Sequence, residues 1–418
     1  MTARDVSTTS RLGAPPGASV MLALATIGFG VNFWAWALIS PLGGDYGGRL
    51  GLSALQQSTL VAIPVLVGSL GRIPVGALTD RVGARIMFPL VSALTIVPVL
   101  FVAFLANSFA MMLLGGFFLG LAGTAFAVGV PLVSSWYPLA HRGTALGIFG
   151  IGMAGTAVSA FTTVQLADAY GRPAPFVLVA VVLAIYAVVS SRLLREAPGR
   201  SIPTGSFLDR TKATMQLGVT WQLSTLYALG FGGFVAFSVY LPTYLNTAYD
   251  LTRTDAATRT AGFIVLAVAA RPFGGWLSDR VGPIPVLTVV FALTGVFAVI
   301  TSLQLPLVPI PTIAFLAMAG CLGAAAGATF ALVGQVAPRE KVGSVTGIVG
   351  AAGGLGGFIP PLIMGASYDA LSSYTLGYLL LAIVAFGVAL YTWGPVRKAA
   401  VRRAEAAAHA PTTGGTHP

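Results

Sequence analysis

The sequence predicts an all-α polytopic membrane protein, because neither its composition nor the spacing of its apolar stretches fits a water-soluble class. Of its 418 residues, 56% are hydrophobic and only 8% are charged, whereas about a quarter of an ordinary soluble domain is charged. Long apolar stretches recur from Val20 to Trp393 with short polar breaks between them. Each stretch is long enough to cross the hydrocarbon layer of a bilayer as a helix.

Twelve apolar stretches are each predicted to form one transmembrane helix. They cover residues 19–41, 57–79, 86–106, 109–137, 143–166, 174–194, 219–245, 258–278, 283–302, 307–335, 343–366 and 375–394. The widest polar interval, 195–216, divides the helices six and six and is predicted to be a cytoplasmic linker. The predicted organisation is a tail over 1–18, a six-helix bundle over 19–194, the linker, a second six-helix bundle over 217–394 and a tail over 395–418.

The basic residues predict the orientation in the membrane. If both termini are cytoplasmic, the outside loops hold only Arg49, Arg172, Arg253 and Arg259, while most of the 23 Lys and Arg residues fall inside. Cytoplasmic loops of membrane proteins are enriched in Lys and Arg. We therefore expect a multi-pass protein of the cell membrane with both termini cytoplasmic, and the net charge of +11 reflects orientation rather than a nucleic-acid partner.

Other classes of protein find little support in the sequence. The polar first 18 residues contain Pro15-Pro16 and no signal-peptide pattern, so no removable leader is expected. The single cysteine, Cys321, excludes a disulfide framework and a cysteine metal cluster. The predicted spans carry no constellation of a nucleophile with a base, and we expect neither an enzyme nor a cofactor.

The two halves of the chain repeat each other. GRIPVGALTDRVG at 71–83 matches ARPFGGWLSDRVG at 270–282 with an offset of 199 residues. GTALGIFG at 143–150 matches GSVTGIVG at 343–350 at nearly the same offset. Internal repeats of this kind are typical of secondary transporters, and they predict two pseudo-symmetric bundles.

Two basic residues, Arg72 and Arg271, lie inside predicted spans, each eight positions before the loop aspartate of its half, Asp80 or Asp279. Eight residues of helix place each arginine about 12 Å into the membrane, at a cost of about 2.5–3.5 kcal/mol. None of the acidic residues falls within a predicted span, so a buried carboxylate does not explain the pair. Two buried cations require a counter-anion, and the planar fork of guanidinium suits a small planar oxyanion.

The motifs that surround these arginines resemble a known family. GALTDRVGAR at 76–85 and GWLSDRVG at 275–282 resemble the loop motifs of the major facilitator superfamily. The arginine pair, the glycine-rich stretch 143–158 and GSVTGIVGAAGGLGGF at 343–358 are similar to the nitrate/nitrite porter (NarK-type) family. The resemblance covers nearly the whole chain and implies the major facilitator fold with nitrate or nitrite as the transported anion.

The resemblance also implies a set of substrate-binding residues. The two arginines of the family fall on Arg72 and Arg271, its aromatic pair on Phe126 and Phe330, and its hydroxyl donor on Tyr227. Asn32 is the only asparagine inside a predicted span and is either a further lining group or an interhelical hydrogen bond. Met153 and Gly353 stand where many members carry asparagine, which removes amide groups that would favour nitrate.

Glycines and charged loop residues complete the predicted machinery. In each half two glycines four residues apart share a helix face and are predicted to let neighbouring backbones approach closely. The signature glycines are Gly143, Gly147, Gly150, Gly343, Gly347 and Gly350. The resemblance implies a cytoplasmic gate of charge pairs formed by Asp80, Arg81, Asp279 and Arg280.

The predicted mechanism is rocking of two bundles about a site near the midplane of the membrane. Repulsion between Arg72 and Arg271 disfavours closure around an empty site, which predicts exchange of nitrate for nitrite. Proton symport stays open, although no His, Asp or Glu lies in mid-membrane. Another small anion such as cyanate or a carboxylate is the alternative substrate, and an anion channel is a distant alternative. We expect a monomer in a lipid bilayer, and RKAAVRR at 397–403 is either a lipid-binding segment or an orientation signal.

Overall fold

The computed structural model describes residues 15–198, 207–337 and 342–408, and the described part of the chain is helical with no strand. It contains 12 helical segments that are long and apolar enough to cross a membrane, as the sequence predicts. Most of these helices start or end a few residues from the predicted limits. Some helices, such as α13 (Arg253–Val281), continue past the apolar stretch into polar residues, whereas α1 (Ala18–Trp36) ends before the stretch does.

The first half of the chain forms six spans, three of which are built from two consecutive helices. They are α1 (Ala18–Trp36), α3 (Ala54–Leu70) with α4 (Arg72–Val82), α5 (Ala84–Phe104), α6 (Phe109–Leu119) with α7 (Ala125–Trp136), α8 (Leu139–Gly150) with α9 (Gly155–Tyr170), and α10 (Pro173–Leu193). A short helix, α2 (Gly43–Leu50), follows α1.

The second half forms six spans of continuous α-helix. They are α12 (Gly218–Tyr249), α13 (Arg253–Val281), α14 (Pro283–Ser302), α15 (Ile310–Val336), α16 (Val342–Leu371) and α17 (Thr375–Tyr391). The spans of the first half are interrupted by 3₁₀ segments at Gly120–Thr124 and Ile151–Ala154. Their counterparts α15 and α16 run through without a break, so the repeat is not matched turn by turn.

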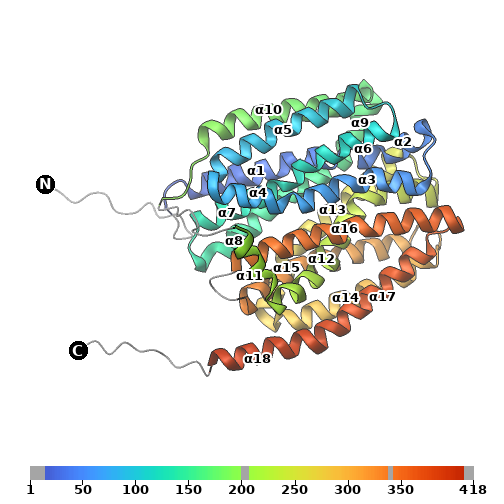
Figure 1. The fold of residues 1–418 in the computed structure, drawn as a ribbon. Coiled ribbons are helices and arrows are strands. Elements are labelled where there is room, and N and C mark those ends of the chain that lie inside the picture. Colours follow the sequence, from blue (N-terminus) through green and yellow to red (C-terminus); the bar gives the residue numbers. More distant parts are fainter. Residues whose placement is uncertain (1–14, 199–206, 338–341, 409–418) are drawn as a thin grey trace, which may run out of the picture.

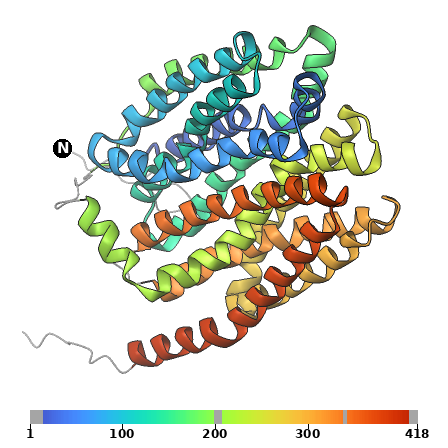
Figure 2. The same cartoon turned by 45° about the vertical axis from the view of Figure 1, so that its right-hand side comes forward.

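The two halves pack as two bundles, one above the other, and the interface runs between α3 and α16 and between α9 and α13 (Figure 1). The turned view keeps the same division (Figure 2). Both ends of the chain emerge at one end of the bundles, which we call the terminal face, and we call the other end the far face (Figure 1). The two predicted bundles are thereby confirmed.

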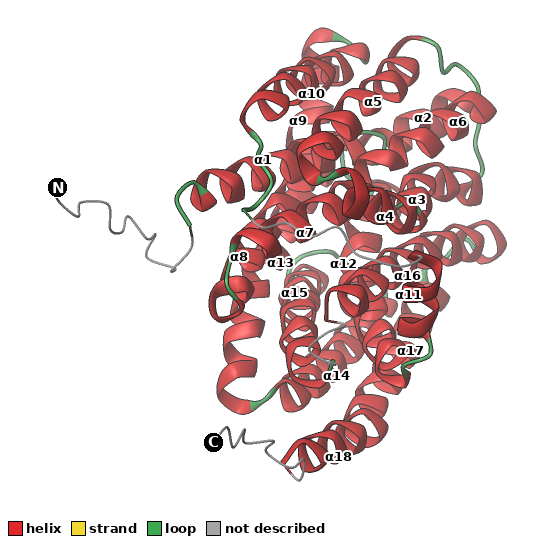
Figure 3. Cartoon of the chain, turned by 60° about the vertical axis from the view of Figure 1, so that its left-hand side comes forward, coloured by secondary structure: helices red, strands yellow, loops and turns green. Residues whose placement is uncertain are grey.

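Two helices lie where the sequence predicts only a linker and a tail. The interval 195–216 contains α11 (Phe207–Met215), which packs against α12 and α16. After a π-helical turn, α17 is followed by α18 (Arg397–Ala408), so the chain stays helical beyond the twelfth span (Figure 3). Both segments are rich in residues of high helix propensity. They were predicted as a linker and a tail because they are polar.

Large apolar side chains cover the outer faces of the bundles. Examples on the outer spans are Val97, Ile185, Val188, Ile383 and Leu390, with exposed fractions from 59% to 74%. A soluble protein rarely exposes apolar patches of this extent to water. Together with the 12 spans, this surface identifies a multi-pass membrane protein.

Candidate functional site

Arg72 lies at the break between α3 and α4 and is only 7% exposed. Its NH1 group donates a hydrogen bond to the carbonyl of Gly350 in the other half, with a distance of 2.7 Å. Its Nε donates to the carbonyl of Gly123 at 3.3 Å. Gly123 belongs to the 3₁₀ segment Gly120–Thr124 between α6 and α7.

Arg271 lies in α13 of the second half and contacts the first half, just as Arg72 of the first half contacts the second. Its NH1 group contacts the thioether sulfur of Met153 in the first half, and its NH2 group donates to the Tyr227 hydroxyl at 3.3 Å. Each arginine therefore reaches the glycine-rich helix of the opposite half. Neutral protein groups thus accept hydrogen bonds from both cations and leave both charges uncompensated.

Aromatic rings surround the two guanidinium groups. The Arg72 guanidinium lies 5.1 Å from the centroid of the Phe126 ring and 5.6 Å from that of Phe231. The Arg271 guanidinium lies 5.7 Å from the same Phe231 ring. Tyr227 stacks on Phe231 and meets Phe330 edge to face, both at 4.9 Å between centroids. The structure thus gathers the predicted arginines, phenylalanines and tyrosine in one place.

Phe231 was missed in the sequence analysis although its ring lies beside both cations. A signal for it exists, because Phe231 follows Tyr227 by four residues on α12 and residues at that spacing share a helix face. One phenylalanine among 24 is not otherwise distinguished. Its role depends on the packing of α12 between the two arginines, which spacing within one helix does not reveal.

The electrostatics of the site favour an anion. The distance between the two guanidinium carbons is at most the sum of their distances to the Phe231 centroid. Two like charges about 11 Å apart repel by about 1.5 kcal/mol at an effective dielectric constant of about 20. In the part of the chain that the structure describes, no cluster of three or more His, Cys, Asp or Glu side chains offers a metal site. The arrangement is suited to holding one small anion.

A cavity of about 310 Å³ leads from Arg72 toward the terminal face. It lies between α4, α7, α11 and α16, and its lining includes Arg72, Asp80, Phe126, Thr211 and Gly347. The linker helix α11 therefore contributes to the wall of the path to the arginines. On the far face the same two halves are in direct contact, since the Ser40 hydroxyl donates to the carbonyl of Val239 at 2.6 Å.

The signature glycines do not make the close backbone contacts expected of them. A methyl group added at Gly143, Gly147, Gly150 or Gly347 would meet no atom within 4 Å, whereas one at Gly350 would lie 3.2 Å from the Phe126 ring. For Gly343, in the first turn of α16, the structure describes the backbone alone. For Gly347 the physical reason is the cavity, which this residue lines.

Other glycines carry the close packing on the far-face side of the site. A methyl group at Gly155 would collide with the backbone of Gly30, and one at Gly354 with the side chain of Ser69. At Gly353 it would collide with the Tyr227 ring and lie 3.0 Å from Phe231. Gly353 therefore leaves room for the Tyr227 and Phe231 stack, which explains why a larger residue is absent there.

Asn32 makes the interhelical hydrogen bond that was one of its two predicted roles. Its side chain is fully buried, and its amide nitrogen lies 2.8 Å from both the Ser92 hydroxyl and the Gly28 carbonyl. The bond to Ser92 joins α1 to α5 within the first half. This arrangement supports a structural role, and substrate binding by Asn32 stays a prediction without structural support.

The cytoplasmic gate also stays a prediction. Asp80 lines the cavity, while Arg81 and Asp279 are exposed. The Arg280 guanidinium lies 4.2 Å from the centroid of the Trp276 ring, one turn earlier on α13. Arg280 is thus held by its own helix.

Two repeated bundles of six spans, with an arginine from each half at their interface, define a secondary transporter. A family model of the major facilitator superfamily matches residues 25–300 and 223–416. In fold the chain is similar to a bacterial homologue of the human lysosomal transporter Spinster, solved in an inward-facing and unoccupied conformation, with a TM-score of 0.69 and 18% identity over 94% of this chain and 99% of that one.

Closer relatives narrow the class. The chain is 49% identical to the probable nitrate/nitrite transporter NarK2 of Mycobacterium tuberculosis over 90% of this chain and 96% of the relative. It is 37% identical to the nitrite extrusion protein of Bacillus subtilis over 88% and 91%, and 35% identical to the probable nitrate transporter NarT of Staphylococcus carnosus over 88% and 93%. The chain belongs to the nitrate/nitrite porter family of the major facilitator superfamily, a family of transporters and not of enzymes.

Truncation of the shared aromatic ring tests the site. We expect Phe231→Ala to raise the Michaelis constant for the anion about 3- to 30-fold, because the cation–π contacts to both arginines are lost. Phe234→Ala is the matched control, since this ring is also 3% exposed but packs against Phe231. Phe126→Ala and Phe330→Ala are expected to act in the same direction as Phe231→Ala. Equal kinetics of Phe231→Ala and Phe234→Ala would assign Phe231 to the core.

Replacement of Asn32 separates its two predicted roles. We expect Asn32→Ala to lower the stability of the purified protein by about 1 kcal/mol, because the buried hydroxyl of Ser92 loses its partner, and to leave the Michaelis constant unchanged. Thermal unfolding and uptake kinetics measure the two effects. A raised Michaelis constant at unchanged stability would place Asn32 in the substrate site instead.

Proposed function

We propose that this protein carries nitrate and nitrite across the membrane by alternating access, with the anion held between Arg72 and Arg271. The observation that carries the proposal is a pair of guanidinium groups, one from each half, whose described protein partners are neutral. A bound anion compensates both charges and joins the halves. The names of the relatives support nitrate and nitrite as the anions.

The proposal includes an orientation in the cell membrane. Counting Lys and Arg by loop favours a cytoplasmic terminal face. The far face is then extracellular, and the cavity below Arg72 opens toward the cytoplasm. The conformation is accordingly inward-facing, with the extracellular sides of the bundles in contact and the cytoplasmic sides apart.

Anion binding would replace the neutral acceptors that contact the two arginines. The arginine edges that now contact the Gly350 carbonyl and the Met153 sulfur are the donors that a planar oxyanion would take. The Tyr227 hydroxyl, already bonded to Arg271, supplies a further donor. Phe126 and Phe330 limit the access of water to the anion, which strengthens the interaction of its charge with the arginines.

Exchange follows from the same charges. Closure of the cytoplasmic side around an empty site brings two cations together in a desolvated space, while closure around an anion is favourable. The groups that contact the arginines in the described structure include no His, Asp or Glu to carry a proton. We therefore favour exchange of nitrate for nitrite over proton symport. Because one chain supplies both halves of the site, we also propose that the transporter works as a monomer.

Uptake of labelled nitrate into proteoliposomes tests the function. We expect uptake to require nitrite inside the vesicles and to be insensitive to an imposed pH gradient. Uptake that needs the gradient and ignores internal nitrite would establish symport instead. Stronger competition by cyanate, formate or oxalate than by nitrite would identify another anion, and currents too large for a rocking cycle would identify a channel.

Conservative replacement of each arginine tests the binding site. We expect Arg72→Lys and Arg271→Lys each to reduce transport to less than about a tenth, because an ammonium group cannot reproduce the planar fork of donors. Size-exclusion chromatography and thermal unfolding check that both variants are folded. Near-normal uptake by both purified variants would exclude the proposed binding role.

A further inference from the structure

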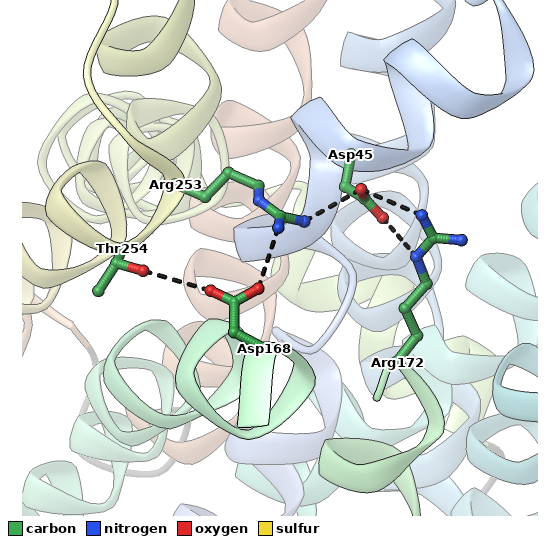
Figure 4. Close-up of polar contacts among 5 residues, drawn as sticks. All are labelled: Asp45, Asp168, Arg172, Arg253 and Thr254. Atoms are coloured by element: carbon green, nitrogen blue, oxygen red, sulfur yellow. Dashed lines mark hydrogen bonds and ion pairs between the residues drawn. The ribbon is translucent and has the colours of Figure 1, made fainter. Parts of the chain in front are cut away.

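A network of charged side chains joins the two halves on the far face (Figure 4). Arg253, the first residue of α13, donates to Asp168 near the end of α9 at 2.9 Å and to Asp45 on α2 at 3.0 Å. The Thr254 hydroxyl reaches the other oxygen of Asp168 at 3.4 Å. Arg172 also pairs with Asp45, at 2.8 Å, but within the first half. The contacts of Arg253 and Thr254 are the ones that cross the interface.

A second carboxylate crosses the interface at another point of the same face. Asp369, near the end of α16, accepts hydrogen bonds from the backbone N–H groups of Ala54 at 2.8 Å and Leu55 at 2.9 Å. These are the first two residues of α3, whose N-terminal N–H groups have no partner within their own helix. A carboxylate is also favoured there by the partial positive charge of the helix N-terminus.

The two contacts are equivalent in the internal repeat. Asp369 lies 201 positions after Asp168, and Arg253 lies 199 positions after Ala54, close to the offsets of the repeated motifs. In each case an aspartate at the far end of a glycine-rich span holds the start of the arginine-bearing span of the opposite half. A surface contact of an aspartate formed by chance has no reason to recur at the symmetry-related position.

The same helix pairs carry the arginine contacts deeper in the membrane. Arg72 of α4, which continues α3, reaches α16, and Arg271 of α13 reaches the segment that leads into α9. Each pair is thus joined at the site and at the far face. The distance between the two levels is about 27 Å for the 18 residues from Ala54 to Arg72.

From this geometry we propose that Asp168 and Asp369 form a paired latch that holds the extracellular side closed and opens in every transport cycle. The proposal rests on the proposed function for the direction of the membrane and for alternating access. The carboxylate of Asp168 and the guanidinium of Arg253 have exposed fractions of 43% and 40%. Exposed pairs are weak, each shifting an equilibrium by a factor of about two to five, which suits a contact that must break repeatedly.

The other basic residues of this face show what a contact without a gating role looks like. Arg259 pairs with Asp255 one turn away on α13, at 2.9 Å, and both are about as exposed as the latch residues. The guanidinium of Arg49 lies 5.3 Å from the centroid of the Tyr46 ring on α2. Both contacts lie within one half of the protein, so their energies do not change when the two bundles separate. Asp255 therefore provides a matched control.

Distances between spin labels test the latch without any substrate. Labels at cysteines replacing Gly48 and Leu303, exposed positions of opposite halves on the far face, report extracellular opening in a Cys321→Ser background. We expect Asp168→Asn and Asp369→Asn each to raise the ratio of open to closed molecules about two- to fivefold. The double variant is expected to raise this ratio by the product of the two factors. Asp255→Asn is expected to leave the ratio unchanged.

Arg253→Gln breaks the Asp168 contact from the other side and also removes the contact with Asp45, so we expect a shift at least as large as that of Asp168→Asn. Equal distance distributions for the latch variants, the control and the parent protein, all folded by thermal unfolding, would overturn the latch even where nitrate transport is intact. If the latch variants open on the extracellular side but the parent protein does not transport nitrate, the latch is supported and the proposed substrate is refuted.

Discussion

The position of two cations at the interface of the bundles, Arg72 buried and Arg271 partly buried, is the constraint on which the site depends. In the described structure Arg72 and Arg271 contact carbonyl, hydroxyl and thioether groups. These neutral groups accept hydrogen bonds from the guanidinium groups but do not balance their positive charges. An unpaired charge in a medium of low dielectric constant is costly. Under the proposed function, a bound anion supplies the missing negative charge and makes this cost tolerable.

Local departures from ideal helix geometry make this burial feasible. The 3₁₀ segments of the first half place the Gly123 carbonyl and the Met153 sulfur beside the arginines. Gly353 leaves the space in which Tyr227 and Phe231 stack. The cations therefore lie among groups that are polar but uncharged, together with ring faces, and an arriving anion meets donors that are already oriented.

The contacts between the halves are distributed unequally along the membrane normal. On the far face, carboxylates and a hydroxyl join the bundles, whereas toward the terminal face a cavity separates them at Gly347. Alternating access requires that neither set be strong, because both states must be populated. Exposed ion pairs and single hydrogen bonds are of the right magnitude.

The class, the 12 spans, the repeat and the two intramembrane arginines follow from the sequence, because apolar length, charge placement and repeat offset are properties of the chain alone. It also gave Phe126, Phe330 and Tyr227 through resemblance. Only the tertiary structure decided which groups serve the arginines, that Phe231 lies beside both, that Asn32 bonds to Ser92, and that Gly143 and Gly347 face open space. Each of these features depends on how the two halves pack against each other and on which face the cavity separates them, and no local sequence pattern encodes this packing.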